Sequence, residues 1–139
     1  IPFEALDADY EIAKEAYLEY FRKMHQLFPK CKKMLMAVRN QIASSHHTLS
    51  GLLYDAVEDQ LYTTRIYDIE PIVDPMGVGD AFIAAYIHAH QKWGDKNQYC
   101  LDFSLSASAI KNTVPGDQNL VTEEEIINNM TSSGGRIQR

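Results

Sequence analysis

Three residues, Gly77, Gly79 and Asp80, have the types and spacing best suited to chemistry. They follow the strand-like pair Ile72–Val73 and precede a mostly apolar run of helical length, so they predict a turn that opens a helix. Glycine leaves the backbone bare, and the first N–H groups of a helix lie without internal partners at the positive end of its dipole. The turn is therefore suited to bind an anion such as a phosphate group.

Asp80 would lie beside that bound phosphate. A carboxylate in this place can remove the proton from a hydroxyl group that attacks the phosphorus. The plainer interpretation is a strand-to-helix turn with an acidic side chain near a helix N-terminus. Asp80 is thus a candidate general base whose role depends on the wider sequence.

Length and composition bound the class of protein. With 139 residues, 45% of them hydrophobic, the sequence predicts one globular domain with enough apolar residues for a core. The net charge of −6 argues against nucleic acid as a partner, and the basic run Lys30–Lys33 is interpreted as a solvated turn. Cys31 and Cys100 lack metal-ligand spacing and are typical of reduced thiols in a cytoplasmic protein. The sequence has no apolar run of about 18 residues, so we expect no membrane partner.

The first third of the chain predicts a helix followed by a buried strand. Asp7 or Asp9 can cap the helix, its apolar residues recur at helical spacing, and Pro29 ends it. Met34–Val38 is a continuous apolar run, as expected for a strand covered on both faces in a parallel sheet. Arg39–Gln41 then predicts a polar loop at the strand's C-terminal edge, where open α/β sheets bind ligands.

The middle of the chain predicts a hairpin and two helices. Leu49–Tyr54 and Leu61–Tyr67 are strand-like runs around a polar turn and predict an antiparallel hairpin. Gly79–Trp93 is apolar nearly all round, which favours a helix inside a layered fold. Asn97–Thr113 alternates like a strand, but it is long, rich in Ala and Ser, and lacks Val, so we expect a helix there.

The end of the chain predicts a short helix and a tail. Thr122–Glu125 has the pattern of a capping box and should open a helix that runs to about Met130. The segment 132–139 carries two glycines and has no apolar face, so it is expected to be mobile.

The string from Asp74 to Phe82, Asp-x-x-Gly-x-Gly-Asp-Ala-Phe, resembles the C-terminal motif of the ribokinase (PfkB) family of carbohydrate kinases. Met76, Val78 and Ala85 depart from the family's usual residues, but the two glycines and Asp80 are kept. The resemblance implies an α/β fold, namely the C-terminal part of a three-layer α/β/α sandwich whose mainly parallel sheet carries an antiparallel hairpin. Family members are considerably longer, so we expect residues 1–139 to be a fragment without the N-terminal half.

A second string, Thr113–Leu120, reads from its residues alone as a Pro-Gly-Asp turn. Within the family it is similar to a string of the 2-keto-3-deoxygluconate kinases, in which the Gly-Asp carboxylate contacts the sugar acid. That role falls on Asp117 by position.

The resemblance implies a reaction and a set of roles. ATP would phosphorylate the primary hydroxyl of a 2-keto-3-deoxy sugar acid, giving the 6-phosphate. Asp80 would be the base. The backbone N–H groups of Gly77, Val78, Gly79 and Asp80 would hold the developing charge, as an oxyanion hole does. Asp117 would orient the sugar.

The resemblance also implies sites for the nucleotide and for metals. Leu105 and Ser108 would lie where adenine packs, and Arg39 and Asn40 near the nucleotide. Asp74 would help to hold a monovalent cation such as K⁺, as its counterpart does in some members, or would instead cap the turn. ATP and Mg²⁺ are the expected cofactors.

Other interpretations stay open. The family's Asn-x-x-Glu motif, associated with Mg²⁺, does not occur in the sequence, so the chain alone is expected to be nearly inactive. Another sugar or a nucleoside could be the substrate, or the chain could be a non-catalytic α/β module that binds a partner. The sequence also leaves open whether the protein forms a homo-oligomer.

Overall fold

The computed structural model of the chain describes residues 10–132. The expected caps Asp7 and Asp9, and all but Ser132 of the expected tail, lie outside this range. The elements of the described residues are, in order, α1 (Tyr10–Leu27), β1 (Lys33–Ala43), β2 (His46–Asp55), β3 (Gln60–Thr63), β4 (Tyr67–Ile69), α2 (Val78–Trp93), α3 (Asn97–Lys111) and α4 (Glu123–Thr131).

Strand β2 is the centre of the sheet. It pairs with β1 along one edge and with both β3 and β4 along the other, and every strand pair in the described residues is antiparallel. The hairpin is confirmed, because Leu53 lies opposite Tyr62 across its turn. Met34–Val38 was expected to have parallel neighbours. Within residues 10–132 this is wrong, since β1 pairs there with β2 alone, and antiparallel.

The second hairpin strand is shorter than the sequence indicated. The predicted run Leu61–Tyr67 divides into β3 and β4, because residues 64–66 leave the ladder. Thr64 fills part of the gap: its hydroxyl accepts from Gly51 N at 2.9 Å, and its N–H donates to Gly51 O at 3.0 Å. The Thr64 side chain thus takes the place of a backbone acceptor for Gly51 N. A pattern of apolar residues does not indicate such a break in a strand.

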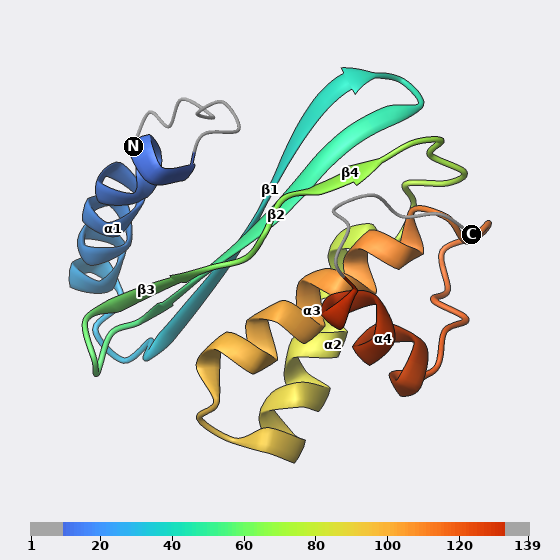
Figure 1. Ribbon diagram of the computed structural model, residues 1–139. Coiled ribbons are helices and arrows are strands. Elements are labelled where there is room, and N and C mark those ends of the chain that lie inside the picture. Colours follow the sequence, from blue (N-terminus) through green and yellow to red (C-terminus); the bar gives the residue numbers. More distant parts are fainter. Residues whose placement is uncertain (1–9, 133–139) are drawn as a thin grey trace.

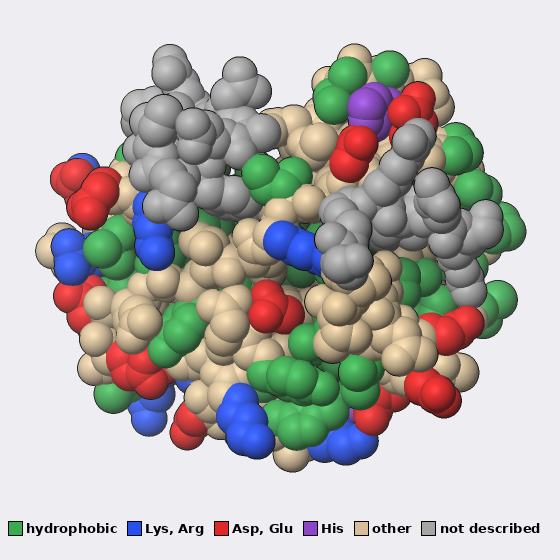
Figure 2. Space-filling view, viewed as in Figure 1, with side chains coloured by type: hydrophobic (Ala, Val, Ile, Leu, Met, Phe, Trp, Pro, Cys, Tyr) green, Lys and Arg blue, Asp and Glu red, His purple; other side chains and the backbone are tan. Residues whose placement is uncertain are grey.

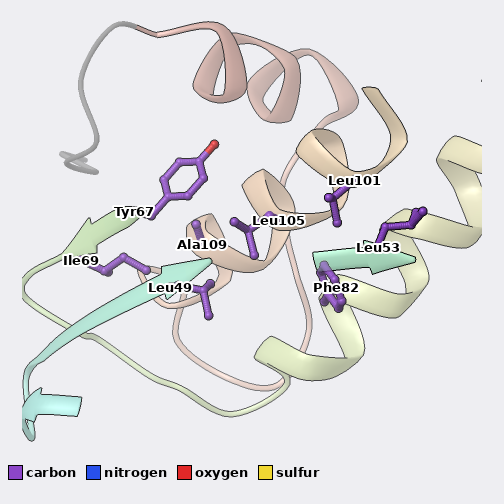
Figure 3. Close-up of a cluster of buried hydrophobic side chains, with 8 residues drawn as sticks. All are labelled: Leu49, Leu53, Tyr67, Ile69, Phe82, Leu101, Leu105 and Ala109. Atoms are coloured by element: carbon purple, nitrogen blue, oxygen red, sulfur yellow. The ribbon is translucent and has the colours of Figure 1, made fainter. Parts of the chain in front are cut away.

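Helices cover both faces of the sheet, with α1 on one face and α2, α3 and α4 on the other (Figure 1). The alternation of side chains along β2 produces this arrangement. Leu52 and Tyr54 pack with residues of α1, whereas Leu49 and Leu53 pack with residues of α2 and α3 (Figure 3). The α/β class and the three layers are therefore confirmed.

Helix α3, and not α2, is the interior helix, because 12 of its 15 residues are buried. The hydroxyl groups of its serines donate hydrogen bonds to backbone carbonyls. Ser104 donates to Cys100 O at 2.6 Å, and Ser106 donates to Ile126 O at 2.8 Å. This explains the strand-like alternation, because small polar residues are as buried as the apolar ones between them. In α2, by contrast, Ile83 is 48% and Ile87 53% exposed, so the expectation of a wholly interior helix is wrong.

Two further expectations were wrong in detail. Arg39–Gln41 belong to β1, which continues to Ala43, and do not form a loop. Ile72–Val73 lie beyond the end of β4, in the connection to α2.

The capping box is confirmed: Thr122 Oγ1 accepts from Glu125 N, and the Glu125 carboxylate accepts from Thr122 N.

Charged side chains of both signs are interspersed on the face shown in Figure 2. Among the described helices, none is long and apolar enough to cross a membrane.

Candidate functional site

Two loops and a hairpin turn meet at one end of the sheet. The loops are the β4–α2 connection and the α3–α4 connection (Figure 1). Ile72 N donates to Ser45 O in the β1–β2 turn at 2.9 Å, and Val73 N and Asp74 N both donate to Asn112 O, at 2.8 and 3.1 Å. The residues that the sequence singled out at 74–80 and 113–120 are thus neighbours in space.

Gly77 is the point of closest approach between the two loops. It caps α2 in the left-handed region, with φ 78°, and a Cβ added there would lie 2.3 Å from the carbonyl oxygen of Asp117. Both facts require glycine. A Cβ at Gly79 would meet nothing within 4 Å, so the first turn of α2 is open on that side.

The start of α2 offers backbone donors. No side chain caps it, and the first backbone bonds of the turn are Ala81 N to Gly77 O at 2.9 Å and a long Val78 N to Pro75 O at 3.4 Å. By helix geometry, the N–H groups of Gly79 and Asp80 have no intrahelical acceptor. Of the predicted phosphate donors, these two are the most available, while that of Val78 is partly used within the turn.

The two predicted carboxylates, Asp80 and Asp117, are both exposed. Asp80 lies in the first turn of α2, where the helix dipole favours its negative charge. Ser108, which is buried in α3, donates from its hydroxyl to Val78 O at 2.9 Å and so fixes this turn against the core. A backbone anchored to the core therefore carries an accessible carboxylate.

Asp74 ties the two loops together. Its carboxylate accepts from Met76 N and from Gly116 N, each at 2.9 Å. These two backbone donors lower the pKa of Asp74, and the positive charge of Lys111 adds to the effect. The interpretation of Asp74 as a turn-capping carboxylate is therefore supported by direct contacts.

The sequence reasoning missed Lys111. Its side chain is fully buried, and its ammonium donates to Val114 O at 2.9 Å and to Asp74 O at 3.5 Å. A positive charge already lies among the carbonyls of both loops, so these residues do not fit a further monovalent cation. The one signal in the sequence was a lone lysine at the end of a helix made largely of small and apolar residues.

The predicted nucleotide contacts lie on two elements, Leu105 and Ser108 on α3 and Arg39 and Asn40 on β1. Leu105 is fully buried in the cluster between the sheet and α3, and the Ser108 hydroxyl is used inside the fold. Arg39 is exposed and Asn40 half-buried on β1, opposite Leu49 and Thr48. These four assignments stay predictions.

Two hollows of about 250 Å³ each lie beside α3, and one of them reaches Ala81, the residue after Asp80. One, between α2, α3 and the segment before α4, includes His88, Phe103 and Glu123. The other includes Arg65, Gln98 and Asp102, from the break between β3 and β4 and from α3. Neither is lined by the predicted site residues.

No family model and no curated protein matches this sequence, whereas solved structures do. A 2-dehydro-3-deoxygluconokinase from Thermotoga maritima is 26% identical with a TM-score of 0.81, over 95% of this chain and 37% of that one. A PfkB family carbohydrate kinase from Listeria grayi is 29% identical with a TM-score of 0.77, over 82% of this chain and 35% of that one. A third structure, from Enterococcus faecalis, is 19% identical with a TM-score of 0.69 and supports the fold alone.

The chain thus spans little more than a third of the length of the kinases it matches. The match extends over nearly all of its own residues and is consistent with the C-terminal part that the motif from Asp74 to Phe82 indicated. The chain has the fold of a part of the PfkB-family carbohydrate kinases.

Proposed function

We propose that this chain, within a protein of kinase length, transfers the terminal phosphoryl group of ATP to the primary hydroxyl of a 2-keto-3-deoxy sugar acid. The observation that carries the proposal is the contact of Gly77 with Asp117, which brings the exposed Asp80 and the open first turn of α2 beside the Asp117 loop. The similarity to 2-dehydro-3-deoxygluconokinase favours this substrate class.

In this proposal Asp80 accepts the proton of the sugar hydroxyl as its oxygen bonds to the γ-phosphorus. The bond from that phosphorus to the bridging oxygen breaks, and ADP leaves with the electron pair. The N–H groups of Gly79 and Asp80, with those of Gly77 and Val78, hold the negative charge on the transferred group. Positioning and charge stabilisation therefore supply most of the catalysis.

Asp117 would orient the sugar by accepting hydrogen bonds from its hydroxyl groups. Its backbone is held by the contact with Gly77, so its position is coupled to that of the phosphate turn. Mg²⁺ would arrive on the ATP phosphates, which it commonly prefers to an all-protein site. The described residues form no group of three carboxylate, histidine or cysteine side chains that could hold a metal, so we assign no step to Mg²⁺.

The test is ADP release by the protein of kinase length that contains these residues, with ATP, Mg²⁺ and 2-keto-3-deoxygluconate. Asp80→Asn should lower kcat by roughly 10²–10⁴-fold and leave KM nearly unchanged, because the base acts in the transition state. Glu124→Gln, which removes an exposed negative charge on α4, is the matched control and should retain the wild-type rate. Equal rates for wild type and Asp80→Asn would exclude Asp80 as the base.

The substrate is tested separately with Asp117→Asn. If Asp117 orients the sugar acid, this change should raise KM for 2-keto-3-deoxygluconate by about tenfold or more, the equivalent of one lost charged hydrogen bond. If fructose or ribose is phosphorylated instead and Asp117→Asn has no effect, the kinase assignment holds and the sugar-acid assignment fails.

A second candidate function is that of a non-catalytic module that packs against a partner. The exposed pair Ile83 and Ile87, one turn apart on α2, favours it because such pairs are common in contacts between chains. If no sugar is phosphorylated, while Ile83→Ser abolishes capture of a partner, the Asp80 turn is scaffolding.

A further inference from the structure

Lys111 is an unusual residue for the interior of this fold. Lysine is almost never fully buried unless its charge is compensated, yet the exposed fraction of Lys111 is 0%. It lies in the last turn of α3, in the stretch from Phe103 to Lys111 in which every residue is buried. Its charge must therefore be balanced by groups within the fold.

The compensating groups come from both loops of the candidate site. The ammonium donates to Val114 O in the α3–α4 loop at 2.9 Å and to Asp74 O in the β4–α2 loop at 3.5 Å. Both acceptors are neutral backbone carbonyl oxygens, which are also the kind of ligand that holds alkali cations.

The surroundings are rich in negative partial charge. The C-terminal end of α3 is the negative end of its dipole. The Asp74 carboxylate lies at the same junction, where it accepts from Met76 N and Gly116 N. After the backbone donors Met76 N and Gly116 N, the charge of Lys111 adds to the lowering of the pKa of Asp74.

We infer that the Lys111 ammonium is a built-in monovalent cation that joins the two loops, so that the site needs no K⁺ and does not respond to it. An ammonium group carries the same charge as K⁺ and directs three N–H donors at oxygens. A second cation among the same oxygens would be repelled by the first. The two hydrogen bonds of the Lys111 ammonium hold the β4–α2 connection, which leads to Asp80, against the α3–α4 loop, which carries Asp117.

The inference concerns the same site as the proposed function, but its test requires neither ATP nor sugar. The thermal unfolding midpoint of the protein is measured in KCl, NaCl and choline chloride at equal ionic strength. For the wild type we expect the same midpoint in all three salts. A higher midpoint in KCl than in choline chloride would overturn the inference, because it would show that the site takes K⁺ in the presence of Lys111.

Two variants test the role of the charge. Lys111→Met keeps most of the volume and removes the ammonium, and should lower the midpoint in choline chloride by roughly 5–10 °C. Lys111→Ala leaves space for an ion, and its midpoint should rise in KCl but not in choline chloride. Lys92→Met is the control, because Lys92 is half exposed and pairs with Glu123 on the surface.

The outcomes separate this inference from the proposed function. If Lys111→Met is as stable as the wild type, the ammonium does not join the loops and the inference fails. If Lys111→Ala does not fold, the wild-type salt series and Lys111→Met decide the question. If no sugar is phosphorylated by any form of the protein, the proposed function fails and the result for Lys111 is unaffected.

Discussion

At the scale of single residues, Gly77 and Gly79 have different structural roles in the turn. Gly77 has φ 78° and lies against the Asp117 carbonyl, whereas Gly79 has no positive φ and has open space where a side chain would be. Gly77 is therefore required for the contact between the loops. Gly79 keeps the first turn of α2 accessible.

This difference predicts opposite effects of the same substitution on stability. Gly77→Ala should lower the free energy of unfolding by roughly 2–4 kcal/mol, from the left-handed backbone and the clash with Asp117 O. Gly79→Ala should be neutral or stabilising by up to about 1 kcal/mol, because alanine favours a helix. Urea unfolding of both variants measures the difference. Equal stability of the two variants would show that the loops do not meet as described.

At the scale of elements, α1 packs on the sheet through apolar side chains and also makes a charged contact with the β2–β3 turn. Arg22 donates to both carboxylate oxygens of Asp59, at 2.9 and 2.8 Å, and Tyr54 donates to the same carboxylate at 2.7 Å. The bonds from Arg22, followed by that from Tyr54, lower the pKa of Asp59 to about 2. Folding therefore favours the ionised form of this carboxyl group.

The pH dependence follows from the direction of this shift. Because the pKa of Asp59 in the folded state, about 2, is below its ordinary value of 3.8, its contribution to stability is present above pH 4. The contribution is lost as the pH falls from about 4 to about 2. Asp59→Asn should therefore lower the unfolding midpoint at pH 6 and have little effect near pH 2, and the left-handed φ of 52° accommodates asparagine.

Arg22→Gln provides the matched measurement. It removes the hydrogen bonds that lower the pKa of Asp59 most, and should therefore lower the unfolding midpoint at pH 6 by much of the amount that Asp59→Asn does. A destabilisation by Asp59→Asn that is the same at pH 6 and pH 2 would show that the carboxylate charge does not contribute.

At the scale of the whole molecule, the candidate site lies on an open edge. Asp80, Gly79 and Asp117 are exposed, and the outer edge of β1 pairs with no strand among the described residues. The kinases that this chain matches are more than twice its length. The residues that would enclose a sugar and exclude water from it are thus not supplied by the described part of the chain.

We therefore expect the 139-residue chain by itself to be folded and almost without activity. Circular dichroism should show helix and strand, while ADP release with ATP, Mg²⁺ and 2-keto-3-deoxygluconate should equal that of a blank without sugar. The physical reason is that an exposed base and anion turn lack the enclosed, water-free surroundings in which they are effective. Sugar-dependent turnover by the chain alone would contradict this.

Much of the fold could be predicted because its signals are local. Helical spacing identified α1, the polar turn identified the hairpin, and the Thr122–Glu125 box identified the start of α4. The two glycines before Asp80 indicated the anion turn in the same way. Each of these features depends on residues within a few positions of one another.

Other features depend on residues far apart in the sequence. The serines of α3 are polar by type, and only their acceptors on neighbouring elements, such as Ile126 O and Val78 O, make them interior residues. The division of β3 from β4 depends on Thr64 reaching Gly51. The pattern of residue types along the sequence indicates neither the burial of these serines nor the break between β3 and β4.

The sequence by itself thus determined the order of the helices, the hairpin and the turn that carries Asp80, because periodicity, caps and glycines act over short distances. The tertiary structure decided which helix is interior and which strand faces are covered. It also decided that Gly77 touches Asp117 and that Lys111 lies between the two loops. Gly77 and Asp117 are 40 positions apart and Lys111 and Asp74 are 37, so short-range patterns in the sequence do not indicate these contacts.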